Sequence, residues 1–414
     1  MPDTIKQYSD PEKPVHVVFV GAGAVGCFYA SRLHHPSKNI HVSLIARSNY
    51  KALLDNGVKL QTYSFGDYTF TPHAVFPNVA AAASAPVQQW DYVVITTKAL
   101  PDRGDDSALI APLIGPNSCI VLIQNGVGVE APYRTRFPST PIISAVTVVS
   151  AEQISQGVIR QNRWTRIHLG PYSNSASFDS STPITKDRDE VSPSATTTPK
   201  VESTGNLTPT GSSSPSPSPS SSAPSSHHKL TDSDLALQQR GYDLASRLTS
   251  YLVHLGSVRD AHLSTESHLQ LIRWHKLCIN AAFNPCSILS GGIGNADMVR
   301  DPELRLFLSA IMYEIWDAAP LILGLPKGEG FEKDPKGFAT PEKILKSTER
   351  NVGSKPSMLL DWEAGRPLEL EVIVGNPVRI ARGRGVEMPR LQGVYALLRS
   401  MQSVRERRKR EGKL

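Results

Sequence analysis

Two patterns of apolar and polar residues divide the chain. In the first part, short apolar runs rich in β-branched residues alternate with glycine and polar residues, as at Val15-His16-Val17-Val18-Phe19-Val20. Such runs are typical of strands that are buried on both faces of a parallel sheet. We predict further parallel strands at 41–46, 91–98 and 120–126, and two antiparallel strands at 144–150 and 157–170 that close the sheet.

From Leu235 onward, apolar residues recur at helical spacing. The predicted helices span 237–255, 262–284, 302–323, 340–350, 373–385 and 390–410. A further stretch begins at residues 357–363 and ends at 369–375. The second part of the chain is therefore expected to be an all-helical domain.

A serine- and proline-rich segment separates the two parts. It contains Ser213-Ser214-Pro215-Ser216-Pro217-Ser218 and hardly any large apolar side chain. It therefore buries too little surface to offset the entropy lost on ordering, and we predict a disordered insert. This insert is either an inert surface insertion or a segment regulated by phosphorylation. The predicted units are a first domain at 14–172, the insert at 173–234, the helical domain at 235–402 and a basic C-terminal tail at 403–414.

The first apolar run leads directly into Gly21-Ala22-Gly23-Ala24-Val25-Gly26 and then into a predicted helix, which places a GxGxxG motif between a strand and a helix. Gly21 permits the tight turn, Gly23 lets the backbone approach a pyrophosphate, and Gly26 lets the helix lie close to the strand. The helix N-terminus, with Ala24 and Val25, supplies N–H donors to the phosphates. We therefore predict an α/β Rossmann-type dinucleotide-binding domain, with the active site in the cleft between this domain and the helical one.

Residues at the carboxyl ends of the following strands indicate the cofactor. Where an NAD site usually places Asp or Glu, this chain has Arg47, which fits the 2′-phosphate of NADP. The alternative is an arginine that is merely solvated at the end of a strand. Lys98 and Asn125 end two further strands, where ligands bind in open α/β sheets, so we expect them to contact cofactor or substrate.

The segment Trp274–Pro285 carries the candidate catalytic chemistry. Lys276, Asn280 and Asn284 are four residues apart and form one ridge on an otherwise apolar helix. Burying a lone ammonium is costly, so Lys276 is expected to face a cleft that holds an anionic or carbonyl-bearing partner. The alternative is that Lys276 extends to water and the asparagines satisfy backbone groups. Pro285 is expected to end or kink the helix.

Composition narrows the classes of partner. The segment Val404–Leu414 carries +4 of the net charge of +6, so the rest of the chain is close to neutral. A nucleic-acid-binding face is therefore not supported. The chain shows no membrane-span-length apolar run and no signal-peptide core at its N-terminus. Four scattered cysteines suit a reducing compartment and argue against disulfides and zinc. We expect a cytoplasmic protein, although Gly412-Lys413-Leu414 is one residue away from a peroxisomal Ser-Lys-Leu address.

With these pieces assembled, the chain resembles the ketopantoate reductase family over about residues 15–172 and 235–400. The resemblance is carried by GAGAVG at 21–26, TKAL at 97–100, QNGVG at 124–128, KLCINAAFNP at 276–285, SMLLD at 357–361 and the stretch from Glu369 to Gly375. It implies a helical domain like that of 6-phosphogluconate dehydrogenase. It also implies NADPH-dependent reduction of 2-dehydropantoate to pantoate, in pantothenate and coenzyme A biosynthesis. The chain departs from the family at Val374, where asparagine is frequent.

The resemblance also implies roles for single residues. Lys276 would be the general acid, and Glu369 would bind the substrate hydroxyl. Arg47 and Lys98 would serve the cofactor together with the glycine turn. Contacts with the substrate or the nicotinamide would come from Asn125, Asn280, Asn284, Ser357 and, after a one-residue gap in the alignment, Asn295.

The chemistry of the residues agrees with these roles. Hydride addition to a ketone develops negative charge on the carbonyl oxygen, and proton donation by Lys276 would contribute roughly 10²–10⁴-fold. Glu369 can help to keep Lys276 charged, unless it is only a surface residue beside Glu371. Two other functions stay open, which are a reductase of a different 2-oxoacid and a non-catalytic NADP(H)-binding sensor. A homodimer also stays open.

Overall fold

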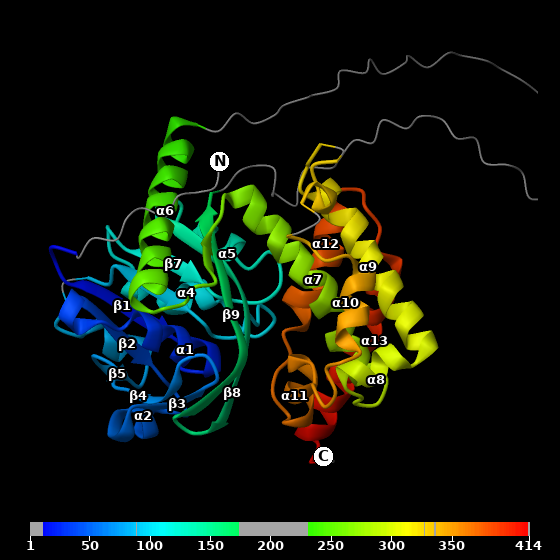
Figure 1. Ribbon diagram of the computed structural model, residues 1–414, viewed down its shortest axis with the longest axis horizontal. Coiled ribbons are helices and arrows are strands. Elements are labelled where there is room, and N and C mark those ends of the chain that lie inside the picture. The colour runs from blue at the N-terminus through cyan, green and yellow to red at the C-terminus, as the bar shows by residue number, and fades with distance from the viewer. Residues whose placement is uncertain (1–10, 88, 174–230, 327, 335–336, 413–414) are drawn as a thin grey trace, which may run out of the picture.

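The computed structural model describes residues 11–87, 89–173, 231–326, 328–334 and 337–412, and Figure 1 shows two domains that lie side by side. One domain is built on a large mixed sheet, and the other consists of helices. The predicted fold class, a Rossmann-like α/β domain followed by a helical domain, is confirmed.

The centre of the sheet is a run of parallel strands, as the apolar pattern predicts. These strands lie side by side in the order β7 (Cys119–Leu122), β6 (Tyr92–Ile95), β1 (Val15–Val20), β2 (Ile40–Ile45) and β5 (Val75–Phe76). The order reverses at β1, between β2 and β6, and in folds of this type a ligand binds at the carboxyl ends of the strands beside such a point.

The two predicted antiparallel strands are present and longer than expected. β8 (Ile142–Ser155) pairs parallel to β7 and antiparallel to β9 (Val158–Tyr172). Beyond β9, the sheet continues with the hairpin of β3 (Val58–Thr62) and β4 (Gly66–Phe70).

Helices cover both faces of the sheet. Along β1, Val17 and Phe19 belong to one core, and Val18 and Val20 belong to another on the opposite face. The short helices of this domain are α1 (Ala24–Leu33), α2 (Tyr50–Asn56), α3 (Val79–Ala83), α4 (Asp106–Ile110) and α5 (Ala131–Arg136). The first core includes residues of α1, and the second includes residues of α3, α4 and α5.

The domain boundary predicted at residue 235 is wrong. Helix α6 (Asp232–Ser250), the π-helix η4 (Tyr251–Leu255) and the strand β10 (Ala261–Leu263) pack on the sheet, and β10 pairs with β9. Helical spacing shows which side of a helix is buried but not which domain buries it. The helical domain instead begins with α7.

The ends of the predicted insert also differ from the prediction. Residues 174–230 lie outside the described part of the chain, but Ser173 is buried and donates to Glu266 from both its backbone N and its Oγ. Thr231 and Asp234 form a capping box that starts α6, because each side chain accepts a hydrogen bond from the backbone N–H of the other residue.

The helical domain is organised around α7 (Glu266–Leu289), which packs against α9 and α11. Its other elements are α8 (Asn295–Arg300), α9 (Pro302–Ile322), α10 (Pro341–Thr348), α11 (Ser357–Glu363), the π-helix η6 (Glu371–Gly375), α12 (Asn376–Gly383) and α13 (Pro389–Arg410). Within the described residues, no helix is both long and apolar enough to cross a membrane.

Of the two outcomes expected at Pro285, an end of the helix is ruled out, because α7 continues to Leu289. The residues around Pro285 are buried in the core, and packing compensates for one missing N–H donor. The basic tail continues α13 as far as Arg410, and the Arg405 guanidinium lies 4.0 Å from the centre of the Trp362 ring. Lys413 and Leu414, of the peroxisomal-type tripeptide, lie outside the described residues.

Candidate active site

The glycine turn has the geometry of a phosphate-binding loop. Gly21 has φ +111°, and an added Cβ would lie 2.8 Å from the Thr97 backbone N. A Cβ on Gly26 would lie 2.2 Å from the Gly21 carbonyl O, so close packing of α1 on the turn requires glycine there too. At Gly23, by contrast, a Cβ would meet nothing within 4 Å. Open space at this residue, beside the N-terminus of α1 at Ala24 and Val25, fits a bound pyrophosphate.

Arg47 lies beside this turn. It directly follows β2, is exposed, and is near enough to Asp106 to influence the pKa of that carboxyl group. Two residues later, Asn49 is buried and donates from Nδ2 to the Ala22 carbonyl at 2.9 Å, which ties the β2–α2 connection to the glycine turn. The Arg47 side chain is thus exposed at the carboxyl end of β2, where a charged ligand can reach it.

Three predicted site residues form one hydrogen-bonded chain across the two domains. Lys276 Nζ donates to Asn125 Oδ1 at 2.8 Å, and Asn125 Nδ2 donates to Glu369 Oε2 at 3.1 Å. The second carboxylate oxygen of Glu369 accepts from the Ala99 backbone N at 3.2 Å. Lys276 and Glu369 belong to the helical domain and Asn125 to the sheet domain, so the site exists only where the domains meet.

Burial shifts the acidity of both charged groups. Desolvation and the nearby Arg273 cation lower the pKa of Lys276 to about 8, and the Glu369 charge opposes this shift. Burial raises the pKa of Glu369, which is 7% exposed, and the hydrogen bonds from Asn125 and Ala99 oppose that change. Lys276 is therefore a stronger acid than an ordinary lysine.

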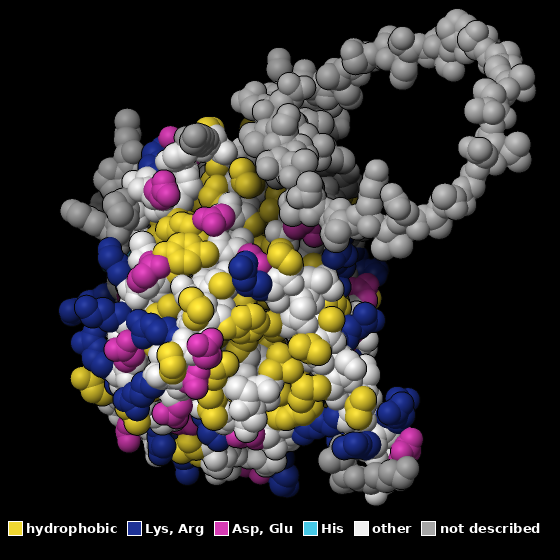
Figure 2. All heavy atoms as spheres, turned by 90° about the vertical axis from the view of Figure 1, so that its right-hand side faces the viewer, with side chains coloured by type: hydrophobic (Ala, Val, Ile, Leu, Met, Phe, Trp, Pro, Cys, Tyr) yellow, Lys and Arg dark blue, Asp and Glu magenta, His cyan; other side chains and the backbone are white. Residues whose placement is uncertain are grey.

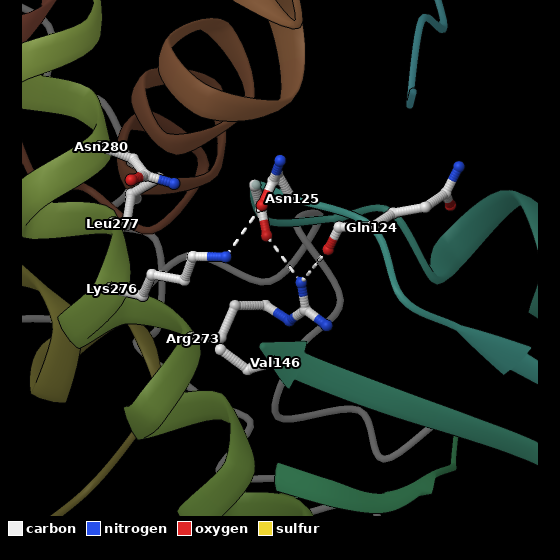
Figure 3. Close-up of a pocket in the computed structure, with 8 residues that line it drawn as sticks. Gln124, Asn125, Val146, Arg273, Lys276, Leu277 and Asn280 are labelled. Atoms are coloured by element: carbon white, nitrogen blue, oxygen red, sulfur yellow. Dashed lines mark hydrogen bonds between the residues drawn. The ribbon is translucent and has the colours of Figure 1, made fainter. Parts of the chain in front are cut away.

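A small pocket opens in front of Lys276, as Figure 3 shows. Asn280, one helical turn beyond Lys276, lines the same pocket. The sheet domain contributes Gln124, Asn125, Gly126 and Val146 to the lining. Two members of the predicted ridge therefore face one cavity, whose volume of about 10 Å³ is close to what a single water molecule requires.

The third member of the ridge, Asn284, lies elsewhere. It is 3% exposed, and its Oδ1 accepts from the Met358 backbone N at 3.4 Å, so it supports the start of α11. Ser357, the first residue of α11, is exposed, and Asn295 donates to Ser354 Oγ at 3.1 Å. The structure does not place Asn284, Ser357 or Asn295 in the lining of the pocket.

Lys98 makes an ion pair with Asp361 of α11 and is about one-third exposed. Asp361 also pairs with Arg366 Nε at 2.9 Å. The predicted cofactor residue therefore also links the sheet domain to the helical domain, close to the Ala99 N–H that holds Glu369.

The prediction missed Arg273, which shapes the pocket from within α7. Its guanidinium donates to the carbonyls of Gln124, at 3.1 Å, and Gly126, at 2.9 Å, on either side of Asn125. The same side chain pairs with Glu130 at 3.2 Å, and both side chains are 3% exposed. Its signal in the sequence was a charged residue one turn before Lys276 on an apolar helix.

The loop that carries Asn125 is pressed against the helical domain. Gly126 has φ +85°, and an added Cβ would lie 2.3 Å from the Val372 carbonyl O. Val127 N donates to that carbonyl at 2.9 Å, and Asn376 Nδ2 donates to Val127 O at 2.9 Å. Only glycine fits at residue 126.

Comparisons with known proteins agree with this geometry. Residues 17–174 match the family model described as ketopantoate reductase PanE/ApbA, and residues 268–402 match the model of the C-terminal part of the same family. An uncharacterized protein of Saccharomyces cerevisiae is 26% identical, and the match covers 95% of each chain. A 2-dehydropantoate 2-reductase of Nostoc is 23% identical over 92% of this chain and 93% of that protein.

Solved structures show the same fold. A crystal structure of 2-dehydropantoate 2-reductase from Methylococcus capsulatus has a TM-score of 0.65 with 26% sequence identity. The match covers 94% of this chain and 97% of that chain, so both domains are included.

Proposed function

Because the chain belongs to the ketopantoate reductase PanE/ApbA family, we propose that it is an oxidoreductase that reduces a 2-oxoacid with NADPH. The proposed substrate is 2-dehydropantoate, and the product is pantoate. The observation that supports the proposal is the hydrogen-bonded chain Lys276–Asn125–Glu369 between the domains, in which Lys276 and Asn125 line the pocket and Glu369 is bound to Asn125 outside the lining.

Lys276 acts as the general acid in this proposal. The cofactor supplies a hydride to the ketone carbon, and the carbonyl oxygen takes the Lys276 proton, which yields the alcohol and an uncharged lysine. With a pKa of about 8, the ammonium is mostly charged at neutral pH and gives up its proton more readily than a solvated lysine does. Asn125 Oδ1 orients the ammonium, and solvent returns the proton after release of the product.

Glu369 binds the hydroxyl group of the substrate. Its carboxylate is buried and already holds two N–H donors, so the remaining lone pairs can accept a hydroxyl hydrogen. Asn280 adds a carboxamide to the same pocket wall and can contact the carboxylate of the substrate. Asn284, Ser357 and Asn295 lie outside the lining, and they reach the substrate in this proposal only if the domains close further.

NADPH is the proposed cofactor. The open face at Gly23 accommodates the pyrophosphate, and the exposed Arg47 is available for a 2′-phosphate. Lys98 has an ion-pair partner in Asp361, so its proposed role is to bind the cofactor while it holds the domains together.

Two alternatives give different results in one experiment. A reductase of another 2-oxoacid would keep the same chemistry, whereas a non-catalytic NADP(H) sensor would not oxidise NADPH with any 2-oxoacid. NADPH oxidation, followed at 340 nm with a panel of 2-oxoacids, separates them. We expect the highest kcat/KM with 2-dehydropantoate. A higher kcat/KM with another member of the panel would reassign the substrate, and no turnover with any member would contradict the proposed function.

Self-association into a homodimer is a further proposal. Figure 2 shows apolar side chains among charged ones on the side of the helical domain that faces away from the sheet. On α9, which belongs to this domain, Leu306 is 67% exposed, and Phe307 and Leu321 are also exposed. Exposed apolar side chains of this size favour contact with another protein. Light scattering after size exclusion should give a dimer mass that Leu306→Glu lowers, and a monomer mass at every concentration would contradict the proposal.

A further inference from the structure

A second cavity, of about 490 Å³, lies between the two domains. The sheet domain lines it with the turn at 99–107 and the start of α5, and the helical domain lines it with Val372 and Asn376. It shares no lining residue with the pocket at Lys276. Its volume is in the range of about 300–1,000 Å³ that is usual for small-molecule sites.

The residues proposed to hold the cofactor phosphates do not line this cavity, and its nearest approach to them is at Asp106, which Arg47 influences. None of its lining residues belongs to the glycine turn at 21–26, and Arg47 is not among them. Part of its lining comes from residues 128–135, which follow the Asn125 loop in the sequence. The cavity lies over helices α4 and α5. A molecule bound there would leave the pyrophosphate position free.

The lining has a definite chemical character. Its apolar wall consists of Ala99, Leu100, Pro101, Val129, Pro132 and Val372. The charged side chains in the lining are both acidic, Asp105 and Asp106, and the described residues that line it include no lysine, arginine or histidine. An anion such as a 2-oxoacid would therefore meet two carboxylates, whose neighbouring cations, Arg136 and Arg47, lie outside the lining.

Two polar groups are available to a ligand. Asp105 is already paired with Arg136 at 2.7 Å, whereas Asp106 accepts from Gln124 Nε2 at the long distance of 3.4 Å and also interacts with the Thr97 side chain and with Arg47. The Tyr133 hydroxyl is buried, with 3% of the residue exposed, and has no hydrogen-bond partner within the described part of the chain. A buried hydroxyl without a partner is costly, and a bound ammonium that donates to the hydroxyl oxygen would remove part of that cost.

We propose that this cavity is a second small-molecule site, for compounds with an apolar body and a primary amine. The ammonium pairs with Asp106, and the apolar body fills the space against the wall at Ala99 and Val372. An alcohol of the same size binds more weakly, because it lacks the charge, and a carboxylate binds least.

The site contacts two residues that support the active-site pocket. The Ala99 backbone N donates a hydrogen bond to Glu369 Oε1. The Val372 carbonyl accepts a hydrogen bond from the backbone N of Val127, in the Asn125 loop. A compound bound against both should change the KM for the 2-oxoacid without displacing NADPH. This consequence rests on the proposed function, whereas binding itself does not.

The test uses three probes with one carbon skeleton, 4-phenylbutylamine, 4-phenylbutanol and 4-phenylbutyrate. Binding to the full-length protein is measured by ligand-observed NMR titration, with and without saturating NADPH. We expect saturable binding of the amine, about tenfold tighter than that of the carboxylate, and the same affinity when NADPH is present. Equal affinities for amine and carboxylate, or displacement of the amine by NADPH, would overturn the proposal.

Two variants test whether the amine binds in this cavity. Ala131 lines it and is exposed on α5, so Ala131→Trp fills the space without disturbing the core, whereas Ala80→Trp makes the same change at an exposed position of α3, outside the cavity. Amine binding should be lost in the first variant and kept in the second. Asp106→Asn should reduce the preference for amine over alcohol. Unchanged amine binding in Ala131→Trp, with the thermal melt of the unmodified protein, would overturn the assignment.

Discussion

The Lys276 ammonium donates a hydrogen bond to the Asn125 side chain at 2.8 Å, across the boundary between the helical domain and the sheet domain. The same carboxamide donates to Glu369, so one sheet-domain residue orients both Lys276 and Glu369. The orientation of the proton donor therefore depends on how the domains are packed, and a change far from the pocket can alter turnover if it moves the Asn125 loop.

Removing the proton donor should affect turnover and spare cofactor binding. In Lys276→Ala, kcat should fall by roughly 10²–10⁴-fold, because Arg273, the other cation in the described pocket lining, keeps its proton and cannot replace the donor as hydride arrives. NADPH affinity, measured by fluorescence titration, should stay close to that of the unmodified protein, because the glycine turn and Arg47 lie on the other domain. A near-normal kcat would show that Lys276 is not the donor.

The pH dependence of turnover should report the Lys276 ammonium. Since the proton donor must be charged, kcat for reduction should be constant at lower pH and fall as the pH rises through about 8. The Glu369 charge raises the pKa of Lys276, so Glu369→Gln should move this fall to lower pH. Steady-state rates from pH 6 to pH 10 test both statements, and a profile that stays flat through this range would contradict them.

Loss of the Glu369 carboxylate should weaken substrate binding at least as much as turnover. Glu369 contacts a group that is present in the ground state as well as in the transition state, so Glu369→Ala should raise KM as well as lower kcat. Glu371→Gln is the matched control, because Glu371 is bound to Tyr395 and Arg379 rather than to the pocket. If only kcat changed in Glu369→Ala, the substrate-hydroxyl role would be wrong.

Arg273 is expected to position the Asn125 loop and, separately, to neutralise Glu130. Arg273→Met leaves a buried carboxylate without its partner and should lower the free energy of unfolding by about 3–5 kcal/mol. The double variant Arg273→Met/Glu130→Gln removes that charge and should recover most of the stability in chemical denaturation. Its kcat should stay low, because the carbonyls of Gln124 and Gly126 still lack their donor. Full recovery of kcat in the double variant would leave Arg273 with a purely structural role.

Cofactor preference should depend on Arg47. NADPH should bind more tightly than NADH, and Arg47→Asp should narrow or invert the ratio of the two dissociation constants, because an acidic residue accepts from the ribose 2′-hydroxyl and repels a 2′-phosphate. Lys59→Asp, an equal charge change at an exposed position of β3, should leave the ratio unchanged. Equal affinities for NADH and NADPH in the unmodified protein would contradict the assignment of NADPH as the preferred cofactor.

The sequence predicted those parts of the fold that depend on neighbouring residues. The strand before Gly21 and the helix after Gly26 follow from local periodicity, and so does the apolar helix that carries Lys276. The position of α6 could not be predicted in this way, because an amphipathic helix fits any apolar surface. Its place on the sheet depends on contacts such as that of the Tyr92 hydroxyl with the Leu244 carbonyl at 3.2 Å, which joins residues 152 positions apart.

The candidate site was predictable to a similar extent. The motifs identified Lys276, Asn125 and Glu369, and the structure brings these three together. The pair of Arg273 and Glu130 was missed, because a buried charge is recognised by its distant partner rather than by its own surroundings in sequence. Asn284 has the spacing of a pocket residue but supports α11 instead, which follows from the packing of two helices.

Glu266 gives the molecule a fixed point at which the chain leaves the described structure and returns. Its carboxylate accepts from Ser173, just before residue 174, and from Gln238 on α6, soon after residue 230. Both ends are thus fastened to the side chain of the first residue of α7, where the sheet domain passes into the helical domain. Because the free-energy cost of closing a loop grows only with the logarithm of its length, a reporter protein inserted between them would perturb neither domain strongly. This position offers a place to attach a fluorescent label while the hydride-transfer machinery stays intact.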